Sequence, residues 1–136
     1  MSATESNCGE NDFSHDIIGA AVEVQRVLGT GLPESVYVAA LALELGEREI
    51  GFMQDVPVSA HYKGKSLGVV QRAHFVVEQA MLVQVKADEA TSELHRSELL
   101  AGLRLTGLKL GLLINFHTYP VVKGVHRLVN KARSEP

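Results

Sequence analysis

Four polar side chains that could bind a ligand lie on two short segments flanking Gln79: Arg72, His74, Gln84 and Lys86. If these segments are strands joined by a turn centred on Gln79, antiparallel pairing places His74 opposite Gln84 and Arg72 opposite Lys86. An imidazole, an amide and two cations on one patch could bind a metal through nitrogen or an anion through charge. The alternative is that the patch is the solvent-exposed face of a sheet and binds no ligand.

The other face of this hairpin is predicted to be apolar. It holds Ala73, Phe75, Val77, Met81, Val83 and Val85. Because side chains alternate along a strand, a slip of one residue in either strand would mix polar and apolar groups on each face. The pattern therefore predicts the register as well as the hairpin.

The elements that must position this hairpin follow from the spacing of apolar residues. Helices are predicted at residues 14–28, from residue 33 to about 49, and at 91–105, with Ser14 capping the first and Pro33 opening the second. Strands are predicted at residues 52–62, 67–77, 81–87 and 108–116, with turns at 63–65 and 78–80. Residues 121–129 form a further strand or helix. The order is ααβββαβ, followed by this last element.

The inward face of each helix is also predicted. It holds Ile17, Ile18, Ala21, Val22 and Leu28 in the first helix, Val36, Tyr37, Ala40, Leu41 and Leu45 in the second, and Leu94, Leu99 and Leu103 in the third. The strand at residues 108–116 is almost wholly apolar, which is typical of a strand buried on both faces.

The chain has 136 residues, of which 46% are apolar and one is cysteine. This length suits one domain, predicted at residues 12–130, with disordered tails at residues 1–11 and 131–136. One cysteine cannot form an internal disulfide, and the N-terminus lacks the apolar core of a signal peptide. No apolar run approaches the ~20 residues of a membrane-spanning helix. We expect a cytoplasmic protein without a membrane partner.

Charge is unevenly distributed although the net charge is only −3. Residues 1–60 contain two Lys or Arg against ten Asp or Glu, whereas residues 61–136 contain eleven against six. The basic second half could bind phosphate, including that of a nucleic acid, or it could bind the acidic half of another subunit. The alternative is a solvated surface with chance clustering.

Short motifs along the chain resemble those of the GxxExxY family of small bacterial proteins, which is classed with the PD-(D/E)xK nucleases. They are GLPESVY at 31–37, YKGK at 62–65, QRA at 71–73, VQVKA at 83–87 and TGLKLGLLINF at 106–116. The resemblance implies an α/β fold of the restriction-endonuclease type, in which helices flank a mixed sheet in the order αβββαβ. It covers nearly the whole chain apart from the tails.

The resemblance also implies a site in which an Asp on one strand and a Glu-x-Lys on the next hold magnesium. Glu34 matches a glutamate of the helical motif, and Lys86 matches the lysine. His74 stands where the family has the Asp, and Gln84 where it has the Glu. On the following helix Glu98 replaces a usual Gln, and Gly102 a usual Tyr.

Magnesium prefers charged oxygen ligands, so the loss of two carboxylates should weaken its binding severely. The leading hypothesis is a pseudoenzyme without a cofactor, kept for its fold, for binding or for self-assembly. Its pocket, with Arg72 and Lys86, could attract an anion instead.

The competing hypothesis is an active phosphodiesterase in which Glu34, His74, Glu98 and Lys86 form a rearranged site that uses Mn²⁺ or Zn²⁺. A third hypothesis, compatible with the first, is a self-assembly module whose exposed sheet edge pairs with a neighbour in a homo-oligomer.

Overall fold

The computed structural model describes residues 13–130. Two helices, α1 (Ser14–Leu28) and α2 (Glu34–Glu47), come first. Three strands follow: β1 (Phe52–Tyr62), β2 (Lys65–Val77) and β3 (Met81–Lys86). The chain then forms α3 (Glu93–Thr106), β4 (Leu110–Asn115), the 3₁₀ helix η2 (Val121–Gly124) and β5 (Val125–Val129). The tails predicted at residues 1–11 and 131–136 lie outside the described residues.

The five strands form one mixed sheet in the order β1-β2-β3-β4-β5. Strands β3 and β4 are parallel and are connected through α3, whereas the other neighbours are antiparallel. The predicted α/β class, the mixed sheet and the order ααβββαβ are confirmed. The element that the sequence left open is a turn of 3₁₀ helix followed by a strand.

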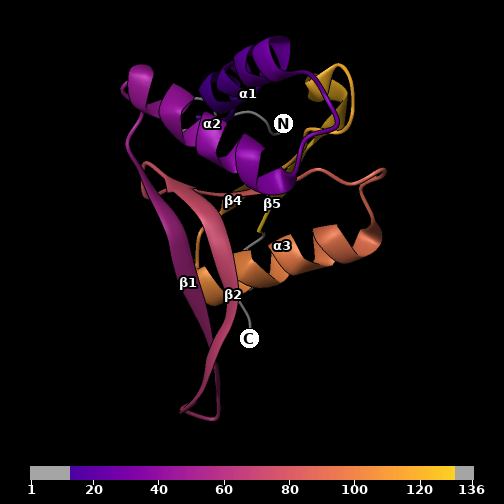
Figure 1. The fold of residues 1–136 in the computed structure, drawn as a ribbon. Coiled ribbons are helices and arrows are strands. Elements are labelled where there is room, and N and C mark those ends of the chain that lie inside the picture. Colours follow the sequence, from indigo (N-terminus) through magenta and orange to yellow (C-terminus); the bar gives the residue numbers. More distant parts are fainter. Residues whose placement is uncertain (1–12, 131–136) are drawn as a thin grey trace, which may run out of the picture.

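Helices cover both faces of the sheet (Figure 1), with α1 and α2 on one side and α3 on the other. The larger core cluster joins α1 and α2 to Phe75, Val83 and Leu112 of the sheet. The smaller cluster joins Leu99 and Leu103 of α3 to the opposite face. Strand β4 contributes to both clusters, which confirms that it is buried on both faces.

Strands β1 and β2 continue beyond the body of the domain as a long hairpin (Figure 1). All of residues 61–70 are exposed, and we call this segment the arm. The turn at its tip has Lys63 and Gly64 with φ values of 51° and 79°. Two successive residues with positive φ are typical of the tight hairpin turn that the sequence predicted.

Several local predictions about the helices are wrong. The N-cap of α1 is Phe13 rather than Ser14, and α2 begins at Glu34 with Pro33 as its N-cap. Helix α3 begins at Glu93, because the side chain of Ser92 accepts a hydrogen bond from the His95 N–H and caps the helix there.

Three residues expected to face inward are exposed: Val22 (44%), Val36 (38%) and Leu94 (64%). In α2 the residues that reach the sheet are Tyr37, Leu41 and Leu45, spaced four apart along one line of the helix. Val36 lies about 100° around the helix from that line, so it points toward solvent. Among residues 13–130, none of the helices is long and apolar enough to cross a membrane.

Candidate functional site

The hairpin of β2 and β3 has the predicted register. Phe75 pairs with Val83, Val76 with Leu82, and Val77 with Met81. The main-chain ladder between the two strands ends at Phe75 and Val83, so the predicted main-chain pairings of His74 with Gln84 and of Arg72 with Lys86 do not form. Beyond this point β2 stays paired with β1, and β3 with β4. We call residues 72–74 and 84–86 the fork.

The Gln84 side chain bridges the two strands of the fork. Its Oε1 accepts a hydrogen bond from the His74 N–H at 2.9 Å, and its Nε2 donates one to the Arg72 carbonyl at 3.3 Å. The amide thus offers β2 one acceptor and one donor, as a neighbouring strand would. A carboxylate in this place could only accept, and it would face the Arg72 carbonyl oxygen without a proton to share.

The His74 side chain makes the reciprocal bridge. Its Nδ1 accepts a hydrogen bond from the Val85 N–H at 2.9 Å, so Nδ1 carries no proton. The proton of a neutral ring must then be on Nε2, which lies 3.2 Å from a carboxylate oxygen of Glu34. His74 therefore donates to Glu34 as a neutral imidazole.

The environment favours this neutral form. Burial of the ring lowers the pKa of His74 below its ordinary value, Glu34 acts in the opposite direction, and Lys86 lowers it further. A second proton, on Nδ1, would also point at the Val85 N–H and break that hydrogen bond. Both nitrogens are thus engaged, one with the main chain and one with a carboxylate.

Glu34 reaches the fork from the first turn of α2, and Tyr37 fixes that turn. The Tyr37 hydroxyl donates to the Gly29 carbonyl at 2.7 Å and accepts from the Leu32 N–H at 3.3 Å. Its ring stacks on Phe116, with centroids 4.7 Å apart. Residues three apart lie on the same side of a helix, so anchoring Tyr37 also orients Glu34. This gives the GxxExxY spacing of residues 31–37 a physical role.

The two cations of the predicted patch differ in position. Lys86 pairs with Asn115 of β4 and acts electrostatically on His74. The Arg72 guanidinium instead lies 3.7 Å from Asp55 of β1, and both side chains are more than half exposed. The structure therefore places His74, Gln84, Glu34 and Lys86 at the fork, whereas the Arg72 side chain turns to β1.

Asp55 is a charged residue of this region that the sequence reasoning missed. It has a φ of 56° and interrupts the ladder between Gln54 and Val56, at the level of His74. Its carboxylate acts on His74 in the direction that raises the pKa. An Asp inside a predicted strand was the available signal, since Asp is depleted in strands.

Glu98 is exposed on α3, and its main-chain carbonyl accepts a hydrogen bond from Gln71 at 2.7 Å. The part of the chain that the structure describes contains no group of three or more His, Cys, Asp or Glu residues that could hold a metal. Gly102 lies beneath Gln71, where an added Cβ would be 2.7 Å from the Gln71 Oε1 and 2.9 Å from Leu82. A larger residue there would require the ends of the Gln71 and Leu82 side chains to move.

A second histidine repeats the arrangement of His74 outside the fork. His95 accepts the Ser92 N–H on Nδ1 at 3.3 Å, and its Nε2 lies 3.0 Å from Asp88. Asn115 holds the same loop through the Asp88 carbonyl. The group caps α3 and ties the β3–α3 loop to β4.

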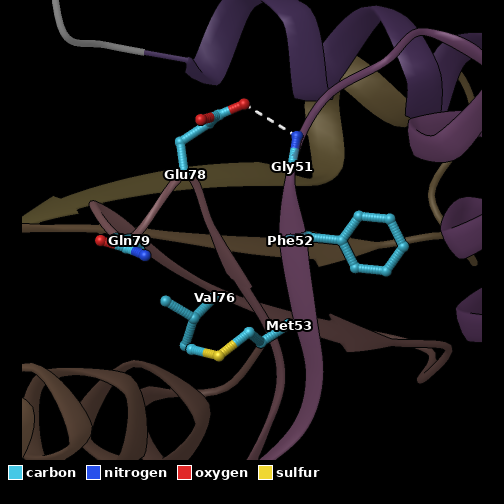
Figure 2. A pocket seen from close by; sticks show the side chains of 6 residues that line it. All are labelled: Gly51, Phe52, Met53, Val76, Glu78 and Gln79. Carbon is cyan, nitrogen blue, oxygen red and sulfur yellow. Dashed lines mark hydrogen bonds between the residues drawn. The ribbon is translucent and has the colours of Figure 1, made fainter.

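One concavity lies near the other end of the hairpin, by the turn between β2 and β3 (Figure 2). It has a volume of about 420 Å³ and is lined by Gly51, Phe52, Met53, Val76, Glu78 and Gln79. The Glu78 carboxylate accepts a hydrogen bond from the Gly51 N–H at 2.8 Å, and the Phe52 ring points away from Met53 and Val76 (Figure 2). None of its lining residues belongs to the fork.

A family model described as the PD-(D/E)XK nuclease superfamily matches residues 11–128. No curated protein and no solved structure matches the chain significantly.

Proposed function

Because the chain belongs to the PD-(D/E)XK nuclease superfamily, we propose that it is a degenerate member that no longer cleaves nucleic acid by a metal-dependent mechanism. Within the superfamily we place it in the GxxExxY family, on the motifs that include residues 31–37. In this proposal the domain is retained for binding or for self-assembly.

The observation that carries the proposal is the use of His74 and Gln84 as main-chain partners. The Gln84 oxygen accepts the His74 N–H, and the His74 Nδ1 accepts the Val85 N–H. The His74 Nδ1 has one lone pair, so binding a cation there would leave the Val85 N–H unsatisfied, at a cost of ~1–3 kcal/mol. The Gln84 oxygen has a second lone pair, but it carries no charge and is a weaker ligand for a hard cation than a carboxylate. His74 and Gln84 thus favour a fork that is closed by hydrogen bonds over a fork in which carboxylates hold a cation.

The remaining donors do not fit magnesium. The His74 Nε2 carries a proton, and magnesium demands oxygen ligands in near-octahedral geometry. Within residues 13–130, Glu34 is the carboxylate in contact with the fork histidine. Lys86 contributes a positive charge beside it, which opposes a cation further.

The direct test is a cleavage assay on single- and double-stranded DNA with Mg²⁺, repeated with Mn²⁺ and Zn²⁺. We expect no cleavage above that of Lys86→Ala protein prepared in parallel. Cleavage that Lys86→Ala abolishes would overturn the proposal. It would support the rearranged site of Glu34, His74, Glu98 and Lys86, and loss of activity in Glu98→Gln would then place Glu98 in that site.

A second test restores the two carboxylates. The double variant His74→Asp, Gln84→Glu should bind Mg²⁺ at least tenfold more tightly than the wild type in titration calorimetry, because two charged oxygen ligands return to one cross-strand position. Arg72→Gln is a control for a change of charge outside the metal position. Equal affinities in the double variant and the wild type would show that the fork is not the place where ligand charge was lost.

A further inference from the structure

The arm, residues 61–70, carries apolar side chains that the fold leaves exposed. Tyr62 is 62% exposed, Leu67 63%, Val69 52% and Val70 51%. Scattered single apolar residues are normal on a surface, but four exposed ones within ten residues of a hairpin are a concentration typical of a contact surface.

Two bulges in β2 set how the arm presents these residues. The ladder passes from Val58–Gln71 to Ser59–Val69, and from Ala60–Gly68 to His61–Ser66. The extra residues in β2 are therefore Val70 and Leu67. Bulges twist a strand and re-aim its side chains. Leu67 and Val70 are therefore presented at irregular positions of the arm.

The arm is also basic. It contains Lys63 and Lys65, lacks Asp and Glu, and is followed by Arg72. The Lys63 ammonium lies 5.3 Å from the centre of the Tyr62 ring. A partner surface should therefore combine apolar groups with negative charge.

A surface of that kind lies on the helical layer of the same chain. A groove between α1 and α2 has a volume of about 190 Å³ and is lined by Glu23, Val24, Val27, Leu28, Ala40, Leu43 and Glu44. We call this the helix groove. Its rim residues Val27 and Leu43 are 63% and 72% exposed. Residues 14–50, which form the two helices and their connection, contain six Asp or Glu and two Arg.

The glutamates at the groove remain available to a lysine. Glu23 contacts Arg26, and Glu44 contacts Arg48, each within its own helix. Exposed pairs of this type contribute little stability and rearrange readily. When both ion pairs are counted as neutral, the layer formed by α1 and α2 still carries more negative than positive charge.

We propose that the arm of one copy of this chain docks in the helix groove of a second copy. Within one molecule the tip of the arm and the helices α1 and α2 lie at opposite ends (Figure 1), so the arm cannot fill its own groove. Pairing arm with arm would bring lysines together, and pairing groove with groove would bring glutamates together. Only the mixed contact matches both apolar surface and charge.

Such a contact is head-to-tail, because the two surfaces differ. An open assembly keeps one free arm at one end and one free groove at the other after every addition, so growth continues until a ring closes or as an open chain. The inference concerns the arm and the helix groove, and it does not depend on whether the fork is catalytic.

The test compares the mass of wild-type protein with that of two exposed-site variants by light scattering over a dilution series. Leu67→Lys alters the arm and Leu43→Lys alters the groove, while Leu94→Lys on α3 is a matched control with a similarly exposed leucine. We expect wild type and Leu94→Lys to exceed the mass of one chain at high concentration, and the other two to remain monomeric. Circular dichroism confirms that each variant is folded.

Mixing the two monomeric variants makes the test specific. Leu67→Lys has an intact groove and Leu43→Lys an intact arm, so the mixture should form one contact and stop at twice the monomer mass. Raising the salt concentration should weaken that contact, since it joins opposite charges.

Three outcomes would overturn the proposal. The first is wild-type protein that is monomeric at every concentration. The second is assembly that neither substitution reduces. The third is wild-type monomer that binds DNA or anionic vesicles through the arm, so that Lys63→Glu with Lys65→Glu abolishes the binding; the arm would then serve a nucleic acid or a membrane instead of a second copy.

Discussion

The two halves of the β2–β3 hairpin satisfy their main-chain groups in different ways. Near the turn the strands pair directly, and Phe75, Val77 and Val83 are fully buried beneath α1 and α2. At the fork, side-chain atoms of His74 and Gln84 take the place of the missing ladder. One half is held by apolar burial, the other by polar contacts.

The difference shows that side chains can replace a strand as hydrogen-bond partners where two strands part. The Gln84 oxygen accepts the His74 N–H, and the His74 Nδ1 accepts the Val85 N–H, at the end of the ladder. In the function proposed above, these positions contribute to stability instead of holding a cation.

The largest expected effect lies in the apolar half. Phe75→Ala should lower the free energy of unfolding by ~3–5 kcal/mol, because it removes a fully buried ring that packs edge-on against Phe52. Urea unfolding followed by circular dichroism measures the change. Val69→Ala in the exposed part of β2 is the control and should cost less than ~0.5 kcal/mol. A loss below ~1 kcal/mol for Phe75→Ala would mean that burial is not what holds this half.

The next effect lies at the fork. His74→Ala should cost ~1–3 kcal/mol, because the Val85 N–H loses its acceptor in a largely buried position. His74→Asn should cost less, since its side-chain oxygen can take the place of Nδ1 as an acceptor. Urea unfolding of the two variants measures both values. Equal losses would indicate that ring packing, rather than the hydrogen bond, is what His74 provides.

The smallest effect is on the pH dependence of stability. The pKa of His74 is lowered in the folded protein, whereas that of an unfolded histidine is about 6.5. The unfolded chain therefore takes up the proton first as the pH falls. The stability contributed by neutral His74 is complete above about pH 6.5 and is lost as the pH drops toward the folded value, by at most ~1.4 kcal/mol per pH unit.

His74→Asn should reduce the slope of stability against pH, because asparagine does not titrate. Thermal unfolding of both proteins between about pH 5 and 8 measures it. The pKa of His126 is also lowered by burial and by Arg96, but it contributes equally to both proteins and cancels in the difference. A steeper slope in the asparagine variant would show that folded His74 is charged.

Much of the secondary structure could be predicted from residue spacing. Helix α1 and strand β1 have the predicted bounds, and the hairpin of β2 and β3 has the predicted register. These are local properties, set by the period of apolar residues and by turn chemistry. The predicted apolar face fails at Ala73, which packs in the smaller cluster with α3 rather than with Phe75. Alternation along a strand holds only while the strand stays with its neighbour, and Ala73 lies beyond the point where β2 leaves β3.

The sequence by itself determined every element but the last, their order, and the fact that positions 74, 84 and 86 approach one another. It could not determine what those side chains do there. The tertiary structure decided that His74 and Gln84 bond to main chain, that Glu34 arrives from α2, and that Arg72 turns to Asp55. The physical reason is that a polar side chain forms hydrogen bonds with whichever nearby groups are still unpaired. Which groups these are depends on where strands β2 and β3 part and on which helix end packs against the fork.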